Sequence, residues 1–304
     1  QRNRISASEA RRIALAAQGF ARPRPDSPDD LRHYRRAMQA IRVLQLDFVN
    51  VLVPAHFLVI WSRLGAYDRP RFERYLYDSR AFTEQWAHEA SIVGVSDWPL
   101  LEHRRRSWKP WKRDPLRSLK DTEGYLRRNL RQVERDGPVT ANDLPPAESL
   151  PARPGEWHRP VQRWALEHHF GRGQLAVRRR LANFQRVYEL PRRLIHEEYR
   201  RARPGHDEAR RQLLRQAAAS LGVATRHDLA DYYRMSPREA APRITELVEE
   251  GALAPVEVEG WREAALMLPE VRIPRRIDGA SLLSPFDPVV WFRPRAERLF
   301  NFHY

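Results

Sequence analysis

The chain has 304 residues, enough for two or three small domains, and its 54 basic residues against 39 acidic ones give a formal net charge of +15. Such a charge is typical of polyanion binders, so we expect nucleic acid as the partner, although only three basic residues are lysines and a GC-rich genome could also cause this arginine excess. The lack of cysteine excludes disulfides, thiol nucleophiles, cysteine-based zinc sites and iron–sulfur clusters, and no apolar run or N-terminal secretory segment predicts membrane insertion. We therefore expect a cytoplasmic, nucleoid-associated protein.

Helix signals dominate the first third of the chain. Ser6-Ala-Ser-Glu9 predicts one helix start and Pro28-Asp-Asp-Leu31 a second. The apolar run VLQLDFVNVL, residues 43–52, then predicts a strand. Further helices are expected from Pro54 to Gly65 and from Arg69 to Tyr77, followed by an extended segment from Ala81 to Val95.

An internal echo organises the rest of the chain. GPVTANDL (137–144) reappears as GVATRHDL (222–229), with glycine, threonine, aspartate and leucine at the same offsets. In each copy the threonine is placed to cap a short helix. The aspartate three residues later can bond back to the threonine backbone amide, in a variant of the capping box. A helical segment precedes each copy, and a third helix and a short extended run follow it. This is the element order of a winged helix-turn-helix.

The predicted fold class is mainly helical with short β-hairpins, arranged as three tandem winged helix-turn-helix domains and the start of a C-terminal β-rich domain. The expected boundaries are residues 1–120, 121–202, 203–278 and 279–304. A proline-rich loop at residues 145–160 interrupts the second domain, and the break near residues 202–206 ends it. The strand-like alternation at the chain end suggests that further sequence follows.

Gln45 and Asp47 lie two positions apart in the strand-like run. Because alternate residues of a strand share a face, we expect these two side chains to project together, while Leu44, Leu46 and Phe48 face the core. A solvated polar face is the simpler alternative. Aspartate is disfavoured in strands, however, and almost all its neighbours here are apolar, so we favour a chemical role for the pair.

Histidines and arginines supply further candidates. His56 and Arg63 share one face of the helix after the strand, where a capping or core role for His56 is the alternative. Trp86 and His88 alternate on QWAHEA and are expected to share a strand face, with a buried, hydrogen-bonded histidine as the alternative. Candidate phosphate contacts are Arg178, Arg179 and Arg180, unless they only form a solvated face. We predict no metal, because the adjacent His168 and His169 cannot easily hold one ion.

Four segments carry a wider resemblance: LQLDFVNVLVPAHFLVIWSRLGAYD (44–68), FTEQWAHEASIV (82–93), the region from Gly173 to NFQRVYELP (183–191), and SLLSPFDPVVWFRPRAERLFNFHY (281–304). They closely resemble the AlkZ/YcaQ type of bacterial DNA glycosylases. The resemblance implies three winged helices with a C-terminal β-rich domain, and an enzyme that removes N7-alkylated purines and in some members unhooks interstrand crosslinks.

Gln45-Leu46-Asp47 matches the catalytic Gln-apolar-Asp tripeptide of that family, in the version typical of the YcaQ-like branch. The resemblance implies that Asp47 activates water at the sugar and that Gln45 positions this water. Asn50, His56 and Arg63 are expected to frame the pocket or hold its backbone. Asp287, in the family motif Ser-Pro-Phe-Asp, is expected either to approach the site or to cap its own turn.

A lyase reaction requires an amine nucleophile, and all three lysines lie between residues 109 and 120, away from the strand. We therefore expect a monofunctional, cofactor-free and monomeric glycosylase acting on double-stranded DNA that contains alkylated bases or crosslinks, in base excision repair. The alternative is a non-enzymatic tandem winged-helix transcription regulator, which leaves Gln45 and Asp47 without a function.

Overall fold

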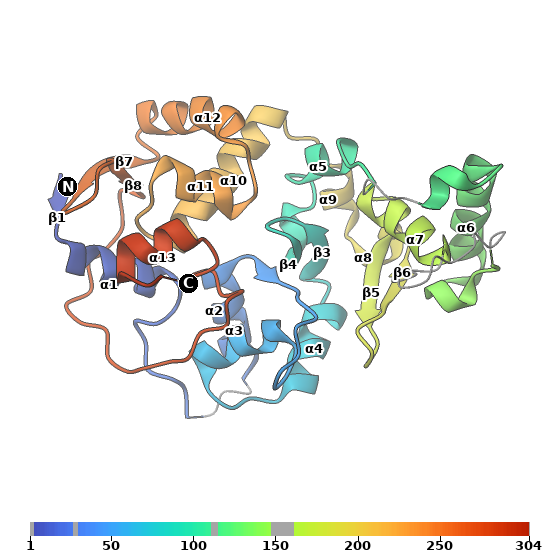
Figure 1. The fold of residues 1–304 in the computed structure, drawn as a ribbon, viewed down its shortest axis with the longest axis horizontal. Coiled ribbons are helices and arrows are strands. Elements are labelled where there is room, and N and C mark those ends of the chain that lie inside the picture. The colour runs from blue at the N-terminus through green and yellow to red at the C-terminus, as the bar shows by residue number, and fades with distance from the viewer. Residues whose placement is uncertain (1–2, 27–29, 111–114, 147–160, 304) are drawn as a thin grey trace.

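The computed structural model describes residues 3–26, 30–110, 115–146 and 161–303. Over these ranges helices predominate, and the strands form two three-stranded sheets and one two-stranded hairpin. Figure 1 shows a main body, built from residues 3–110 and 206–303, and a side unit of residues 115–201 that projects from it.

Ten elements make up the N-terminal part of the main body: β1 (Arg4–Ile5), α1 (Ala7–Ala17), α2 (Leu31–Ile41), β2 (Leu44–Gln45), α3 (Ala55–Leu64), α4 (Arg69–Asp78), β3 (Phe82–Trp86), β4 (Ala90–Gly94), the 3-10 helix η1 (Val95–Asp97) and α5 (Glu102–Arg106). The expected helices are confirmed, and Ser6 and Glu9 form a capping box at α1. The expected extended segment from Ala81 to Val95 is instead the antiparallel hairpin β3–β4, which joins β2 in the order β2-β4-β3.

The predicted strand at residues 43–52 is far shorter than expected. Only Leu44 and Gln45 pair with β4, and Phe48 is 65% exposed, so the expectation that Phe48 faces the core is wrong. A local side-chain bond accounts for the early end of the strand. The Asp47 carboxylate accepts a hydrogen bond from the Val49 amide at 2.7 Å, and such a turn competes with the strand ladder.

The side unit contains η2 (Pro115–Ser118), α6 (Thr122–Asp136), η3 (Ala141–Asp143), α7 (Val161–Gly171), β5 (Ala176–Arg180), β6 (Arg186–Glu189), α8 (Pro191–Leu194) and α9 (Glu197–Arg201). The C-terminal part of the main body contains α10 (His206–Leu221), α11 (Arg226–Tyr232), α12 (Pro237–Glu249), β7 (Ala254–Val258), β8 (Ala265–Met267) and α13 (Arg293–Phe300). Both echoed threonines cap as predicted: Thr140 forms a capping box with Asp143, and Thr225 with Asp228. Most of the proline-rich loop lies outside the described residues.

The N-terminal and C-terminal parts of the main body pack together in common hydrophobic clusters. Val43 and Leu101 lie in one buried cluster with Leu213 and Tyr232. The strand β1 pairs in parallel with β7, and α1 packs on α10 so closely that a Cβ added to Gly222 would lie 2.8 Å from the Ile13 carbonyl oxygen. Residues 4–17 therefore pack on the C-terminal part, although the sequence suggested that they belong to a domain of residues 1–120.

The C-terminal segment differs from its expected β structure. The described residues 279–303 contain no strand.

 This segment contains the helix α13 instead. Arg295, Ala296 and Leu299 recur at helical spacing in it and are buried together. The expectation of a β-rich segment from residue 279 is therefore wrong for the residues described here.

Candidate active site

A row of polar side chains crosses the sheet β2-β4-β3. Gln45 pairs with Ser91, and Ser91 pairs with Gln85, so the three side chains project from the same face. All three are buried, and Gln45 is the most exposed of them at 8%. Gln85 donates to its neighbour's carbonyl and accepts from Arg105. The Gln45 amide has no hydrogen bond to any described residue, which leaves its donor and acceptor available to a bound molecule.

Asp47 lies two residues beyond the end of β2 and is partly exposed. One carboxylate oxygen accepts the Val49 amide, and the other has no hydrogen bond within the described ranges. The exposed Asn50 lies farther along the same loop, which closes where Asn50 bridges to Pro54. The sequence predicted a shared strand face for Gln45 and Asp47, but the structure places Asp47 on the loop that leaves the sheet next to Gln45.

His56 is buried beneath this loop, in the first turn of α3. Its ring lies 5.6 Å from that of Phe184, at the tip of the β5–β6 hairpin, and Phe184 lies 5.6 Å from Phe48. Burial and the nearby Arg180 guanidinium lower the pKa of His56 to about 3, so the ring is neutral at pH 7. The hairpin of the side unit thus reaches the loop that carries Asp47.

An ion-pair network joins the side unit to β3. Glu84 accepts two hydrogen bonds from Arg180, at 2.7 and 2.9 Å, one from Arg186 at 2.8 Å and one from Tyr77 at 2.7 Å. Burial opposes its charge, but the two guanidinium groups outweigh burial and lower the pKa of Glu84 to about 2. Arg180 is therefore occupied by Glu84 and is not the phosphate contact that the sequence suggested.

Arg178 and Arg179 remain accessible on β5. Arg178 is partly exposed, with a guanidinium nitrogen 3.9 Å from the Asp78 carboxylate, and Arg179 is exposed. These two arginines, unlike Arg180, keep the solvent access that a phosphate contact requires.

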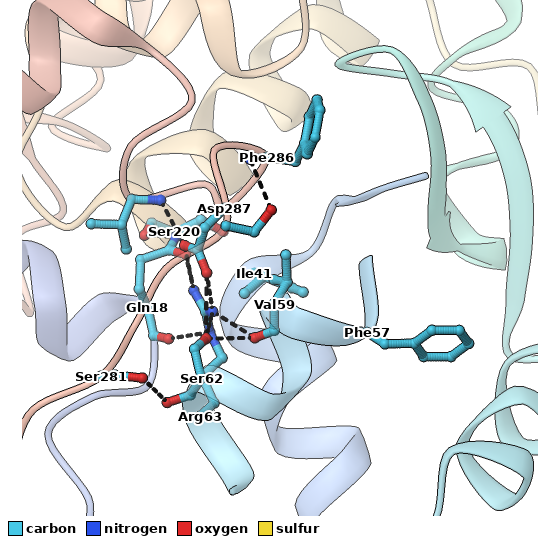
Figure 2. A network of polar contacts seen from close by, with 12 residues as sticks. Gln18, Ile41, Phe57, Val59, Ser62, Arg63, Ser220, Ser281, Phe286 and Asp287 are labelled. Atoms are coloured by element: carbon cyan, nitrogen blue, oxygen red, sulfur yellow. Dashed lines mark hydrogen bonds and ion pairs between the residues drawn. The ribbon is translucent and has the colours of Figure 1, made fainter. Parts of the chain in front are cut away.

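Arg63 and Asp287 meet in a buried ion pair that holds the C-terminal segment against α3 (Figure 2). Their contacts are 2.6 and 3.1 Å long, and Arg63 also donates to the side chain and carbonyl of Gln18. Asp287 accepts the Val289 amide and so caps its own turn. The polar groups of both side chains are bound within the protein, so the pair forms a structural link between α3 and the C-terminal segment.

Trp86 and His88 do not share a strand face, because β3 ends at Trp86 and His88 lies in the turn that follows. Trp86 packs toward Phe170 in the side unit. His88 instead stacks on Trp291, with ring centroids 3.8 Å apart, and its Nδ1 lies 3.2 Å from the Asp231 carbonyl oxygen. The buried, hydrogen-bonded alternative therefore describes His88.

The buried state of His88 predicts a pH dependence of stability. Burial and Arg234 lower the pKa of His88 from 6.5 to about 3. Because the unfolded chain takes up this proton first, the contribution of His88 is present above pH 6.5 and is lost as the pH falls toward 3, by about 1.4 kcal/mol per pH unit. His88→Phe keeps the stacked ring but cannot bind a proton. We expect its free energy of unfolding, measured in urea, to fall less steeply than that of the wild type between pH 6.5 and 5; equal slopes would contradict this.

Sequence reasoning missed a cleft of about 490 Å³ between α5 and the side unit, lined by one glutamate, Glu102, and by the arginines Arg105, Arg106, Arg172, Arg200 and Arg203. Arg105 lies over the Trp98 ring at 3.9 Å and donates to Gln85, the residue in the same row as Gln45. Burial lowers the pKa of Arg105 to about 10, which still leaves it charged at pH 7. The excess of positive charge makes this cleft suited to an anion. The arginines of this cleft come from separate segments of the chain, so no local sequence pattern could predict the cleft.

The described ranges contain no helix that is both long and apolar enough to cross a membrane. They also contain no group of three or more histidine, aspartate or glutamate side chains arranged to hold a metal ion.

Comparison with known proteins shows the family of the chain. The family model described as DNA glycosylase AlkZ-like matches residues 38–304. The fold is similar to that of the Streptomyces sahachiroi DNA glycosylase AlkZ, with a TM-score of 0.58 and 16% sequence identity over 97% of this chain and 81% of that one. The match to the family model covers most of the sequence, and the chain belongs to the AlkZ-like DNA glycosylase family.

Proposed function

We propose that this protein is a monofunctional DNA glycosylase that hydrolyses the N-glycosidic bond of N7-alkylated purines in double-stranded DNA. The observation that supports this most directly is that the Gln45 side-chain amide and one Asp47 carboxylate oxygen are both without a protein partner among the described residues. Gln45 has no hydrogen bond to the described protein, and Asp47 keeps one oxygen open on the adjoining loop. These are the groups needed to hold and activate a water molecule.

The chemistry suits a base that is already cationic. An N7-alkylguanine carries positive charge, so the bond between N9 and the sugar C1′ breaks with its electron pair moving to the purine, without prior protonation. Asp47 stabilises the positive charge that develops at C1′ and takes a proton from the attacking water, whose oxygen forms the new bond to C1′. Gln45 orients this water through its amide. The neutral, buried His56 is not required as an acid.

We also propose that the chain contains three winged helices. One is supported by the order α10, α11, α12 and β7–β8, and a second by the order α6, η3, α7 and β5–β6. In each, a threonine caps the second helix. The group α2 to β4 supports the third. Residues 4–17 pack with the unit of α10–α12 and β7–β8, which modifies the proposed domain of residues 1–120.

A glycosylase assay tests the proposal. Duplex DNA with one N7-methylguanine is incubated with the protein, and the abasic product is cleaved with alkali and compared with a protein-free control. We expect base release above that control, and a second duplex crosslinked by a nitrogen mustard tests whether the lesion class extends to crosslinks. Tight binding to one undamaged sequence without any base release would favour the transcription-regulator alternative.

The arginine cleft supports a duplex DNA partner and gives a salt-dependence prediction. Each phosphate contact that is removed should lower the slope of log Kd against log salt by about 0.9. We expect Arg172→Ala and Arg200→Ala each to reduce the slope measured with duplex DNA between low and moderate potassium chloride. Arg192→Ala is the control, because this exposed arginine is already paired with Glu134. Slopes unchanged by both cleft variants would remove the cleft from the DNA contact surface.

A further inference from the structure

The loop that follows Asp47 concentrates exposed apolar side chains. Of the seven large apolar side chains that are exposed among the described residues, four lie on this loop: Phe48 (65%), Val49 (52%), Val51 (87%) and Leu52 (81%). Single exposed apolar residues are ordinary on protein surfaces, but four within five consecutive positions are not. Their placement directly after the Gln-Leu-Asp tripeptide calls for a ligand with an apolar interior.

The loop has a defined shape. The Asp47 carboxylate accepts the Val49 amide at 2.7 Å, and the Val49 carbonyl accepts the Ala55 amide at 3.1 Å. Farther along, Asn50 bridges to Pro54 and closes the tip. Val51 and Leu52 therefore project from a closed turn that is anchored to Asp47 at one end and to α3 at the other.

Base pairs in DNA are apolar on their stacked faces, and proteins enter the stack with phenylalanine, leucine, isoleucine or methionine wedges. A protein partner seated on this loop would cover Asp47, whereas DNA would bring the damaged sugar to it. The arginine cleft, which Arg105 connects to the row of Gln45, offers positive charge for the adjoining backbone. These arguments favour a DNA duplex as the occupant.

We infer that Val51 and Leu52 form a wedge that enters the base stack of duplex DNA beside the lesion and so presents the damaged nucleotide to Gln45 and Asp47. The inference rests on the proposed glycosylase function. The hydrogen bond between Asp47 and Val49 ties the wedge to the carboxylate, so insertion of the loop also sets the position of the catalytic group. A wedge separates a lesion from its neighbours without requiring complete rotation of the nucleotide, which suits purines that remain tied to the opposite strand.

The double variant Val51→Ser, Leu52→Ser tests the wedge, and Leu282→Ser is its matched control. Leu282 is 80% exposed, as Val51 and Leu52 are, but it lies in the C-terminal segment and away from the Asp47 loop in sequence. All three side chains are so exposed that serine removes little packing, and circular dichroism and urea unfolding verify the fold of each variant. The substrates are duplexes with N7-methylguanine, one of them with 2-aminopurine beside the lesion as a reporter of stacking.

We expect the wild type and Leu282→Ser to raise 2-aminopurine fluorescence at saturating protein, and the double variant to lose most of this rise. Base release by the double variant should fall about tenfold or more, because unstacking would no longer be offset by the wedge. The defect should shrink when the base opposite the lesion is absent, since less stacking and pairing must then be broken.

Wild-type fluorescence and base release in the double variant would overturn the wedge while leaving the glycosylase function intact. A fluorescence rise with wild type but no base release from any alkylated duplex would sink the proposed function while supporting the wedge. Loss of self-association in the double variant, with unchanged DNA signals, would instead identify the loop as a contact between two copies and would also overturn the inference.

Discussion

We expect Asp47→Asn to lower the rate of N7-methylguanine release by about a hundredfold or more, with little change in DNA affinity. Asparagine can still accept the Val49 amide through its side-chain oxygen, so the turn that shapes the loop is preserved. What is lost is the negative charge beside C1′ and the group that accepts a proton from water. Single-turnover kinetics with excess protein measure this loss separately from binding.

Two further variants separate charge from shape. Asp47→Ala removes both the charge and the bond to Val49, so we expect it to be at least as slow as Asp47→Asn and also to lose part of the 2-aminopurine signal. Asp121→Asn is the matched control, because Asp121 accepts the Gly124 amide at the start of α6 in a similar way but lies in the side unit. Equal rates for wild type and Asp47→Asn would show that the charge of Asp47 is not needed for base release.

Local signals in the sequence predicted local structure well. The glycine, threonine and aspartate of each echo specify a helix end, a cap and a reciprocal bond within eight residues, and both copies form these features. The same reasoning failed for the strand at residues 43–52. Its apolar run favoured continuous pairing, but one short bond from Asp47 to Val49 diverts the chain, and Phe48 becomes exposed.

Long-range pairings explain the rest of the difference between sequence and structure. Arg63 and Asp287 each looked like a site residue, but they are 224 positions apart and satisfy one another in the protein interior. The sequence suggested Arg180 as a phosphate contact, but Arg180 binds Glu84, which lies 96 positions away. Nothing in the spacing of charges along a chain shows which cation meets which anion after folding. The unusual apolar setting of Gln45 and Asp47 made them candidates, but the sequence could not distinguish free arginines from buried ones.

The second large effect is expected from Glu84→Gln, which should lower the free energy of unfolding by about 3 to 5 kcal/mol, measured in urea at pH 7. The change leaves the guanidinium groups of Arg180 and Arg186 buried with less compensation, although Arg186 keeps Glu167 at 2.7 Å. The pH dependence should change with it. The folded pKa of Glu84 is lowered from 4.5 to about 2, so its contribution is fully present above pH 4.5 and is lost as the pH falls toward 2.

Glu84 also links the side unit to β3, because its partners Arg180 and Arg186 belong to β5 and β6. In Glu84→Gln we expect the β5–β6 hairpin to loosen from β3, so that Phe184 no longer supports Phe48 and the Asp47 loop. Base release should then fall along with stability, and small-angle scattering should show a larger radius of gyration. The control is Glu134→Gln, which breaks an exposed pair with Arg192 and should change stability by less than about 1 kcal/mol. If both variants proved equally stable, water or other side chains would have to satisfy Arg180 and Arg186, and the side unit would be held by its apolar contacts alone.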